Sequence, residues 1–202
     1  MPRHGISSLE MKKLNLNLSI FLLLISSVCF AQKKVKSKDN ARTNIVMLKN
    51  GALFVRLKTS ELQISGLKKR GKEKEAEEIR KEQENNNRSI IAAFKADFNF
   101  CPVYFFYSTY STKVKEGNYK GCLMNTDMQI DSSFNSNNYL IGEFDESTTT
   151  QLDAFFIKDK NYIQLSRPFP FLIKQNEMLV TTRSYNKIAS ILNGKLFSFY
   201  SK

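Results

Sequence analysis

The residues of this chain that could do chemistry follow two apolar runs, residues 52–58 and residues 103–107. Both runs are rich in aromatic and aliphatic side chains and are typical of buried strands. If the two strands are parallel, their carboxyl ends lie at one edge of the sheet, where open α/β sheets bind ligands. The hydroxyl, phenol and basic side chains that we expect at this edge are Lys58, Thr59, Ser60, Tyr107 and Ser108, with Arg167 as a further cation.

This set of residues could hold a small anionic ligand. Thr59 or Ser60 could cap the helix that follows, and a helix N-terminus attracts negative charge. Lys58 and Arg167 would add positive charge. Ordinary capping and loop chemistry is the interpretation that we favour. The catalytic alternative is a hydrolase or transferase that uses carboxylates or Ser and Lys groups at the strand ends.

A second group of residues is acidic and comprises Glu143, Asp145, Glu146 and Asp153. Glu143 and Asp145 alternate along a predicted strand and therefore share a face. Paired carboxylates can hydrolyse glycosides or bind Ca²⁺, but the regular ligand spacing of a Ca²⁺ loop is absent. We interpret the group as a solvated strand face and turn, and we predict no metal and no cofactor.

The composition excludes several kinds of catalysis. The only histidine among 202 residues is His4, which precedes a predicted signal peptide. The mature protein then has no imidazole for a Ser-His-Asp triad, a Cys-His dyad or a metal site. The patterns G-x-G-x-x-G, G-x-x-x-x-G-K-[ST] and G-x-S-x-G are also missing. We assign no catalytic residue and favour a non-enzymatic protein over an enzyme.

The N-terminal region predicts export. The basic segment Met11-Lys12-Lys13 is followed by an apolar stretch over residues 14–28. Cys29 and Ala31 then place small residues at the −3 and −1 positions before Gln32. This order is typical of a signal peptide, so we expect residues 11–31 to be cleaved after Ala31. Residues 1–10 look like an upstream extension, and either Met1 or Met11 is the start. The pattern suits a periplasmic or secreted bacterial protein.

Two other fates of the N-terminus stay open. The first is an uncleaved anchor, although the apolar stretch is shorter than the roughly 20 residues of a membrane span. The second is lipidation of Cys29, against which Val28 counts because such sites want a small residue before the cysteine. After cleavage we expect no stable membrane span.

The positive charge is concentrated in residues 32–44, which we interpret as a basic linker. Residues 32–42 hold five basic residues and one acidic residue, within a chain of formal net charge +12. Such a tail can be attracted to anionic lipid or to an acidic polymer, but a solvated linker is the interpretation that we favour. Nucleic-acid binding would use basic residues clustered on one face with stacking aromatic side chains, and an exported protein would rarely meet a genome, so we expect no nucleic-acid partner.

Cys101 and Cys122 are the cysteines of the predicted mature chain. An oxidising compartment would allow them to form a disulfide. The alternative is two buried free thiols. A C-x-x-C motif is absent, so nothing supports a redox role.

We predict one globular domain over residues 45–202, of the α/β (or α+β) class. The predicted sheet is mixed, with an N-terminal βαβ unit, a long charged helix within residues 60–98, antiparallel C-terminal strands and a C-terminal helix. Gly66 and Gly71 are candidate breaks near the start of the long helix. Residues 108–138 are polar and read as a long surface excursion.

Two local predictions are specific enough for the structure to test. Residues 45–48 and 52–58 flank Asn50-Gly51, which predicts either a β-hairpin or a short helix that ends at Gly51 in a left-handed cap. Residues 154–157 and 162–165 predict a second hairpin around residues 158–161.

These observations favour an exported cell-envelope domain that binds a small anionic ligand or a protein partner, with the oligomeric state left open. An exposed aromatic patch around Phe169 and Phe171 would favour this binding role. A pocket that gathers Lys58, Ser60, Tyr107 and Arg167 would instead favour the hydrolase or transferase.

Overall fold

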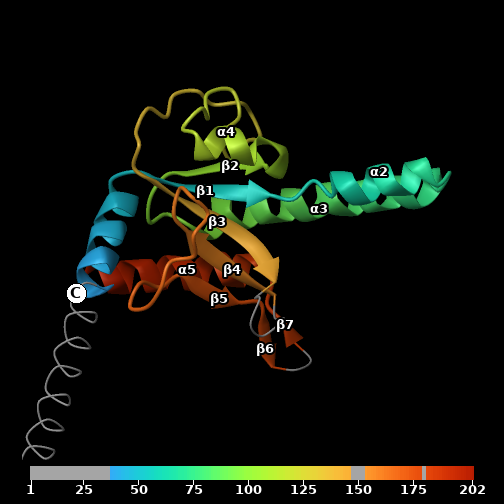
Figure 1. The fold of residues 1–202 in the computed structure, drawn as a ribbon. Helices are drawn as coiled ribbons and strands as arrows, with labels where there is room; N and C mark the ends of the chain where they lie inside the picture. Colours follow the sequence, from blue (N-terminus) through green and yellow to red (C-terminus); the bar gives the residue numbers. More distant parts are fainter. Residues whose placement is uncertain (1–36, 147–152, 179–180) are drawn as a thin grey trace, which may run out of the picture. The chain divides into compact units, whose positions relative to one another are not determined.

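The computed structural model describes residues 37–146, 153–178 and 181–202 (Figure 1). The predicted upstream extension, the predicted signal peptide and the first residues of the predicted linker lie outside these ranges. The chain divides into two units, residues 1–40 and residues 41–202. The fold and the candidate site described below belong to the second unit.

The second unit is built on a mixed sheet of five strands in the order β2-β1-β3-β4-β5. β1 lies between β2 and β3 and is parallel to both, whereas the pairs β3–β4 and β4–β5 are antiparallel. The predicted mixed sheet is therefore confirmed. The strands are β1 (Ala52–Leu57), β2 (Val103–Tyr107), β3 (Tyr139–Glu146), β4 (Asp153–Lys158) and β5 (Leu172–Lys174).

Two helices, α2 (Glu61–Lys69) and α3 (Glu73–Asp97), connect β1 to β2 and complete the predicted βαβ unit. They lie antiparallel and form a helical hairpin (Figure 1). Gly66 does not break the helix but lies inside α2. The break is at Gly71, whose φ of 72° is the left-handed conformation that glycine adopts without strain.

The chain ends in the predicted helix, α5 (Tyr185–Tyr200), which begins where the side chain of Ser184 accepts a hydrogen bond from the backbone of Lys187. Residues 196–200, which could have formed a strand, extend this helix. A small second sheet, β6 (Asn176–Met178) with β7 (Thr181–Thr182), precedes it.

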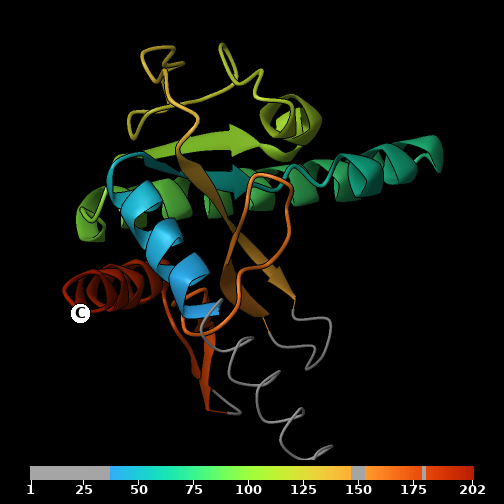
Figure 2. The same ribbon diagram turned by 60° about the vertical axis from the view of Figure 1, so that its left-hand side comes forward.

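One face of the sheet is covered by helices. Leu53, Val55 and Leu57 alternate along β1 and belong to a buried cluster with residues of α3, of α5 and of the helical residues 41–49. Figures 1 and 2 show α3 and α5 on this side of the sheet and α4 (Ser111–Lys115) on the other side.

The opposite face carries a second, aromatic core. Phe54 of β1 stacks on Tyr139 of β3 with ring centroids 4.4 Å apart, and Phe134 approaches it edge-on at 5.1 Å. Val114, Leu123 and other residues of segment 108–138 complete this cluster. The segment that we expected to be a surface excursion therefore also covers a core, because its few apolar residues are the ones that pack.

The hairpin predicted around Asn50-Gly51 is wrong, and the alternative helix is present but without the predicted left-handed cap at Gly51. Residues 37–49 are helical, including 37–44, which we placed in the linker. Ala41, Ile45 and Leu48 are spaced along one helical face and are buried. Gly51 has no left-handed φ. Glycine is needed there because an added Cβ would lie 1.7 Å from the backbone oxygen of Asn138.

The strand predicted over residues 162–165 is also absent from the described structure, where Gln164 makes an isolated bridge with Lys158. The side chain of Asp159 accepts hydrogen bonds from the backbone N–H groups of Asn161 and Ile163, at 2.9 and 2.8 Å. These bonds fold the chain into a turn, so β5 supplies the next antiparallel strand instead.

Candidate functional site

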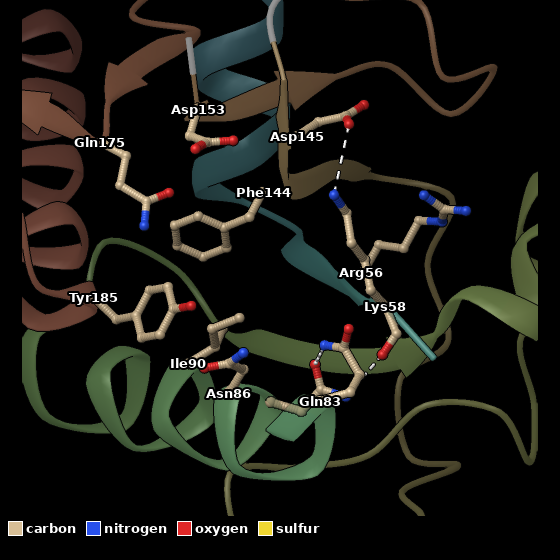
Figure 3. Close-up of a pocket in the computed structure, with 11 residues that line it drawn as sticks. Arg56, Lys58, Gln83, Asn86, Ile90, Phe144, Asp145, Asp153, Gln175 and Tyr185 are labelled. Carbon is tan, nitrogen blue, oxygen red and sulfur yellow. Dashed lines mark hydrogen bonds and ion pairs between the residues drawn. The ribbon is translucent and has the colours of Figure 1, made fainter. Parts of the chain in front are cut away.

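A polar cavity of about 250 Å³ opens where β1 and β3 end, between α3 and the first turn of α5 (Figure 3). Its lining combines charged groups, side-chain amides and an aromatic pair. The charged residues are Arg56, Lys58, Asp145 and Asp153. This is the edge of the sheet at which ligands of α/β proteins usually bind.

A chain of hydrogen bonds joins α3 to the end of β1 at one side of the cavity. Asn87 is buried and donates from Nδ2 to the backbone oxygen of Lys58 at 2.8 Å. Its Oδ1 accepts from Gln83 at 3.2 Å, and Gln83 in turn accepts from the hydroxyl of Ser60 at 2.8 Å. These bonds fix the long helix against the strand whose end forms the site.

An ion network around the buried Glu143 extends into the lining of the cavity. Glu143 of β3 is only 3 % exposed and accepts from Arg56 Nη1 at 2.9 Å and from the ammonium group of Lys158. Asp145 lies 3.7 Å from both Lys58 and Lys158. Each cation near the cavity is therefore already close to a carboxylate.

Four polar side chains of the lining make no hydrogen bond within the described residues: Asn86, Asp153, Gln175 and Tyr185. Figure 3 shows them around the ring of Phe144, which packs edge-on against the ring of Tyr185 at a centroid distance of 5.0 Å. Burial, followed by the nearby carboxylate of Asp153, raises the pKa of Tyr185. The phenol thus keeps its proton as a hydrogen-bond donor at neutral pH.

The predicted strand-end residues partly converge. Thr59 and Ser108 follow neighbouring parallel strands, and their hydroxyl oxygens lie 3.0 Å apart. Lys58, Ser60 and these two residues line one open hollow of about 440 Å³. Tyr107 lines the hollow next to it, of about 450 Å³, together with Thr59.

Two details of that prediction are wrong. Ser60 precedes α2 but makes no capping bond, because its backbone is left-handed (φ 52°) and its hydroxyl donates to Gln83. Arg167 does not join the strand ends. It lines a separate hollow with Phe169 and Lys195, because its loop packs along the far side of β4, where Phe171 accepts from the backbone of Ile157.

Neither of the two features that would have separated binding from catalysis is present as described. Phe169 is 2 % exposed, so it forms no exposed aromatic patch with Phe171. The pocket that we expected to contain Arg167 does not include this residue.

The cavity near Asp145 contains residues that the sequence did not single out, above all Gln83, Asn86 and Asn87 of the charged helix. The Asn85–Asn87 run that interrupts the charges was the one signal that could have indicated them.

The candidate disulfide is not formed, because Cys101 and Cys122 are both free and buried. Cys101 packs in the core on the helical face of the sheet. The thiol of Cys122 instead points at the backbone oxygens of Asn118 and Lys120 in its own turn, 4.0 and 3.9 Å away.

In the described ranges, no group of three or more His, Cys, Asp or Glu side chains is arranged to hold a metal ion. No helix there is both long enough and apolar enough to span a bilayer. No protein-family model matches the chain, and comparisons with curated proteins and with solved structures found no significant similarity.

Proposed function

We propose that this protein is an exported, non-enzymatic domain that binds a small neutral ligand rich in hydroxyl groups, such as a saccharide. The observation that carries the proposal is the convergence of Asn86, Asp153, Gln175 and Tyr185 on one cavity. They come from α3, from β4, from the connection between β5 and β6, and from α5. No local backbone pattern explains why four unused polar groups should meet there.

The chemistry of these four groups suits neighbouring hydroxyls. A side-chain amide offers donors and an acceptor, a phenol offers one of each, and a carboxylate accepts. The ring of Phe144 adds an apolar wall for the C–H face of a sugar. The volume of about 250 Å³ is slightly below the usual range for ligand sites, which favours a ligand of about one ring.

The charges favour a neutral ligand over the anionic ligand expected from the sequence. Arg56 is bound to Glu143, and Lys58 lies beside Asp145. The carboxylate of Asp153 has no cationic partner among the described residues. An anion entering the cavity would have to displace an existing pair and would approach an uncompensated negative charge.

The lining supports binding better than hydrolysis. A glycosidase needs two carboxylates with separate roles, one of which holds a proton. Asp145, the neighbour of Asp153 in this cavity, lies 3.7 Å from the ammonium groups of Lys58 and Lys158 and is therefore already engaged in ion pairs. A hydrolase that uses Asp153 and Asp145 is the alternative function.

The exported location is supported by the sequence pattern of residues 11–31 alone. It predicts that the protein meets its ligand outside the cytoplasm.

Binding can be tested by saturation-transfer NMR of the purified protein against a panel of neutral, amino and acidic monosaccharides. We expect contacts with neutral sugars, and we expect the Asp153→Ala and Tyr185→Phe variants to weaken binding about tenfold each through lost hydrogen bonds. The matched controls are Asp127→Ala and Tyr104→Phe, which lie away from this cavity and should bind as the unaltered protein does.

Three results would count against the proposal. The first is an absence of signal from every sugar, and the second is a preference for acidic sugars. The third is equal weakening in the control variants. Release of a cleaved product from a disaccharide, lost in Asp153→Ala, would establish the hydrolase instead.

A further inference from the structure

The α2–α3 hairpin separates charge along its length. Its turn, residues 68–74, carries five basic side chains and one acidic side chain, and we call this segment the hairpin tip. The next ten residues of α3, 75–84, carry five acidic and two basic side chains. The basic residues of the tip are all exposed: Lys68, Lys69, Arg70, Lys72 and Lys74.

The hairpin tip is held in a fixed shape. The backbone N–H groups of Arg70 and Lys72 both donate to the oxygen of Leu67, at 3.0 Å each. Leu67 of α2 and Ala76 of α3 are buried where the two helices pack. The basic side chains therefore project from a rigid turn and not from a flexible loop.

Much of this positive charge is available to a partner. Lys72 pairs with Glu75 at 2.8 Å, and Arg70 uses its Nε to bond the backbone oxygen of Gly66. Lys68, Lys69 and Lys74 make no ion pair with any residue that the structure describes. In Figures 1 and 2 the tip lies at the free end of the hairpin, beyond the end of β1.

We propose that the hairpin tip docks end-on onto an anionic phospholipid surface. Headgroups in a bilayer form a flat field of negative charge, which a compact, convex group of lysines can approach without shape matching. The acidic residues 75–84 are repelled by the same field, so only the tip is attracted and the hairpin stands away from the surface.

The tip is less suited to nucleic acid. Binding to single strands uses aromatic side chains that stack on the bases, and the tip contains none. Leu62 of α2 is a strongly exposed apolar side chain, but it lies near the opposite end of that helix. A duplex would be expected to contact a basic stripe along a face, whereas the basic residues here occupy one end of the hairpin.

The test is vesicle co-sedimentation with residues 32–202, which contain the whole second unit but not the predicted signal peptide. We expect binding to vesicles with phosphatidylglycerol, none to pure phosphatidylcholine vesicles, and release by high salt. The triple variant Lys68→Gln, Lys69→Gln, Lys74→Gln should reduce partitioning on the order of 100-fold, since each lysine near such a surface contributes about fivefold.

The matched control removes the same charge elsewhere through Lys115→Gln, Lys120→Gln and Lys160→Gln, all at exposed positions. It should keep most of the binding. Equal loss in both triple variants would overturn the proposal in favour of a net-charge effect. Unchanged binding in the tip variant would also overturn the proposal and would assign the vesicle binding to the basic linker of residues 32–44. Equally tight binding to duplex DNA or to heparin would identify a general polyanion site and would also overturn it.

Discussion

At the residue scale, Glu143 is the group that the fold must compensate most completely. Its carboxylate is buried, and each of its oxygens faces a cation, Arg56 on one side and Lys158 on the other. Arg56 also donates to the hydroxyl of Ser111 at 2.8 Å. The three charged residues come from β1, β3 and β4, so the network ties together the parallel and the antiparallel halves of the sheet.

Replacing Glu143 by glutamine should therefore destabilise the protein strongly. The variant leaves two cations without their carboxylate in a largely buried setting, which typically costs about 3 kcal/mol or more. Urea unfolding measures the loss. Asp145→Asn is the control, because that side chain is 44 % exposed and its contacts with two lysines are long. We expect a change below about 1 kcal/mol there, and equal losses at both positions would contradict the role of burial.

Cys101 should be chemically inert in the folded protein. Burial raises the pKa of its thiol to about 12, so almost no thiolate is present at neutral or mildly alkaline pH. Alkylation followed by peptide mass spectrometry should leave Cys101 unmodified until denaturant is added. Recovery of a Cys101–Cys122 cross-linked peptide would contradict the free thiols of the structure.

At the scale of elements, two glycines with opposite surroundings test how the sheet and the helical hairpin are built. Gly142 lies in β3, and a Cβ there would come within 2.3 Å of the ring of Phe155 on β4. The ring of Phe155 thus occupies the space that a side chain at position 142 would fill. Gly66 lies in α2, where no atom lies within 4 Å of an added Cβ.

Alanine should therefore act in opposite directions at these two positions. Gly142→Ala should lower the free energy of unfolding by about 1–3 kcal/mol, because Phe155 has to move in a packed core. Gly66→Ala should raise it by up to about 1 kcal/mol through helix propensity. Thermal and urea unfolding of both variants check this. A stabilising Gly142→Ala substitution would contradict the packing of Phe155 against Gly142.

At the scale of the whole molecule, the prediction to test is export with cleavage of the signal peptide. The predicted cleavage after Ala31 lies outside the described residues, so it stays a prediction. When the full chain is expressed in an exporting bacterial host, the intact mass from the envelope fraction should correspond to a protein that begins at Gln32. A mass that retains residues 11–31 would favour the uncleaved anchor, and a lipid adduct on Cys29 would favour lipidation.

Local sequence patterns predicted most of the elements of this fold. The apolar runs gave β1, β2, β3 and β4 within a few residues, and the spacing of Ile188 and Leu192 gave α5. Patterns misled where one motif fits two structures. Asn50-Gly51 predicts a hairpin, but residues 41–49 form a helix because their apolar side chains can be buried together only with helical spacing.

By itself, the sequence determined the α/β class, the mixed sheet and the gathering of Lys58, Thr59 and Ser108 at the strand ends, because alternation and helical spacing are local properties. Only the tertiary structure decided what surrounds those ends. Asn86 is far along the chain from Gln175 and Tyr185, and it meets Tyr185 because α3 and α5 pack on the same face of the sheet. Arg167 lies away from the strand ends because its loop packs against β4, a contact that local sequence patterns do not specify.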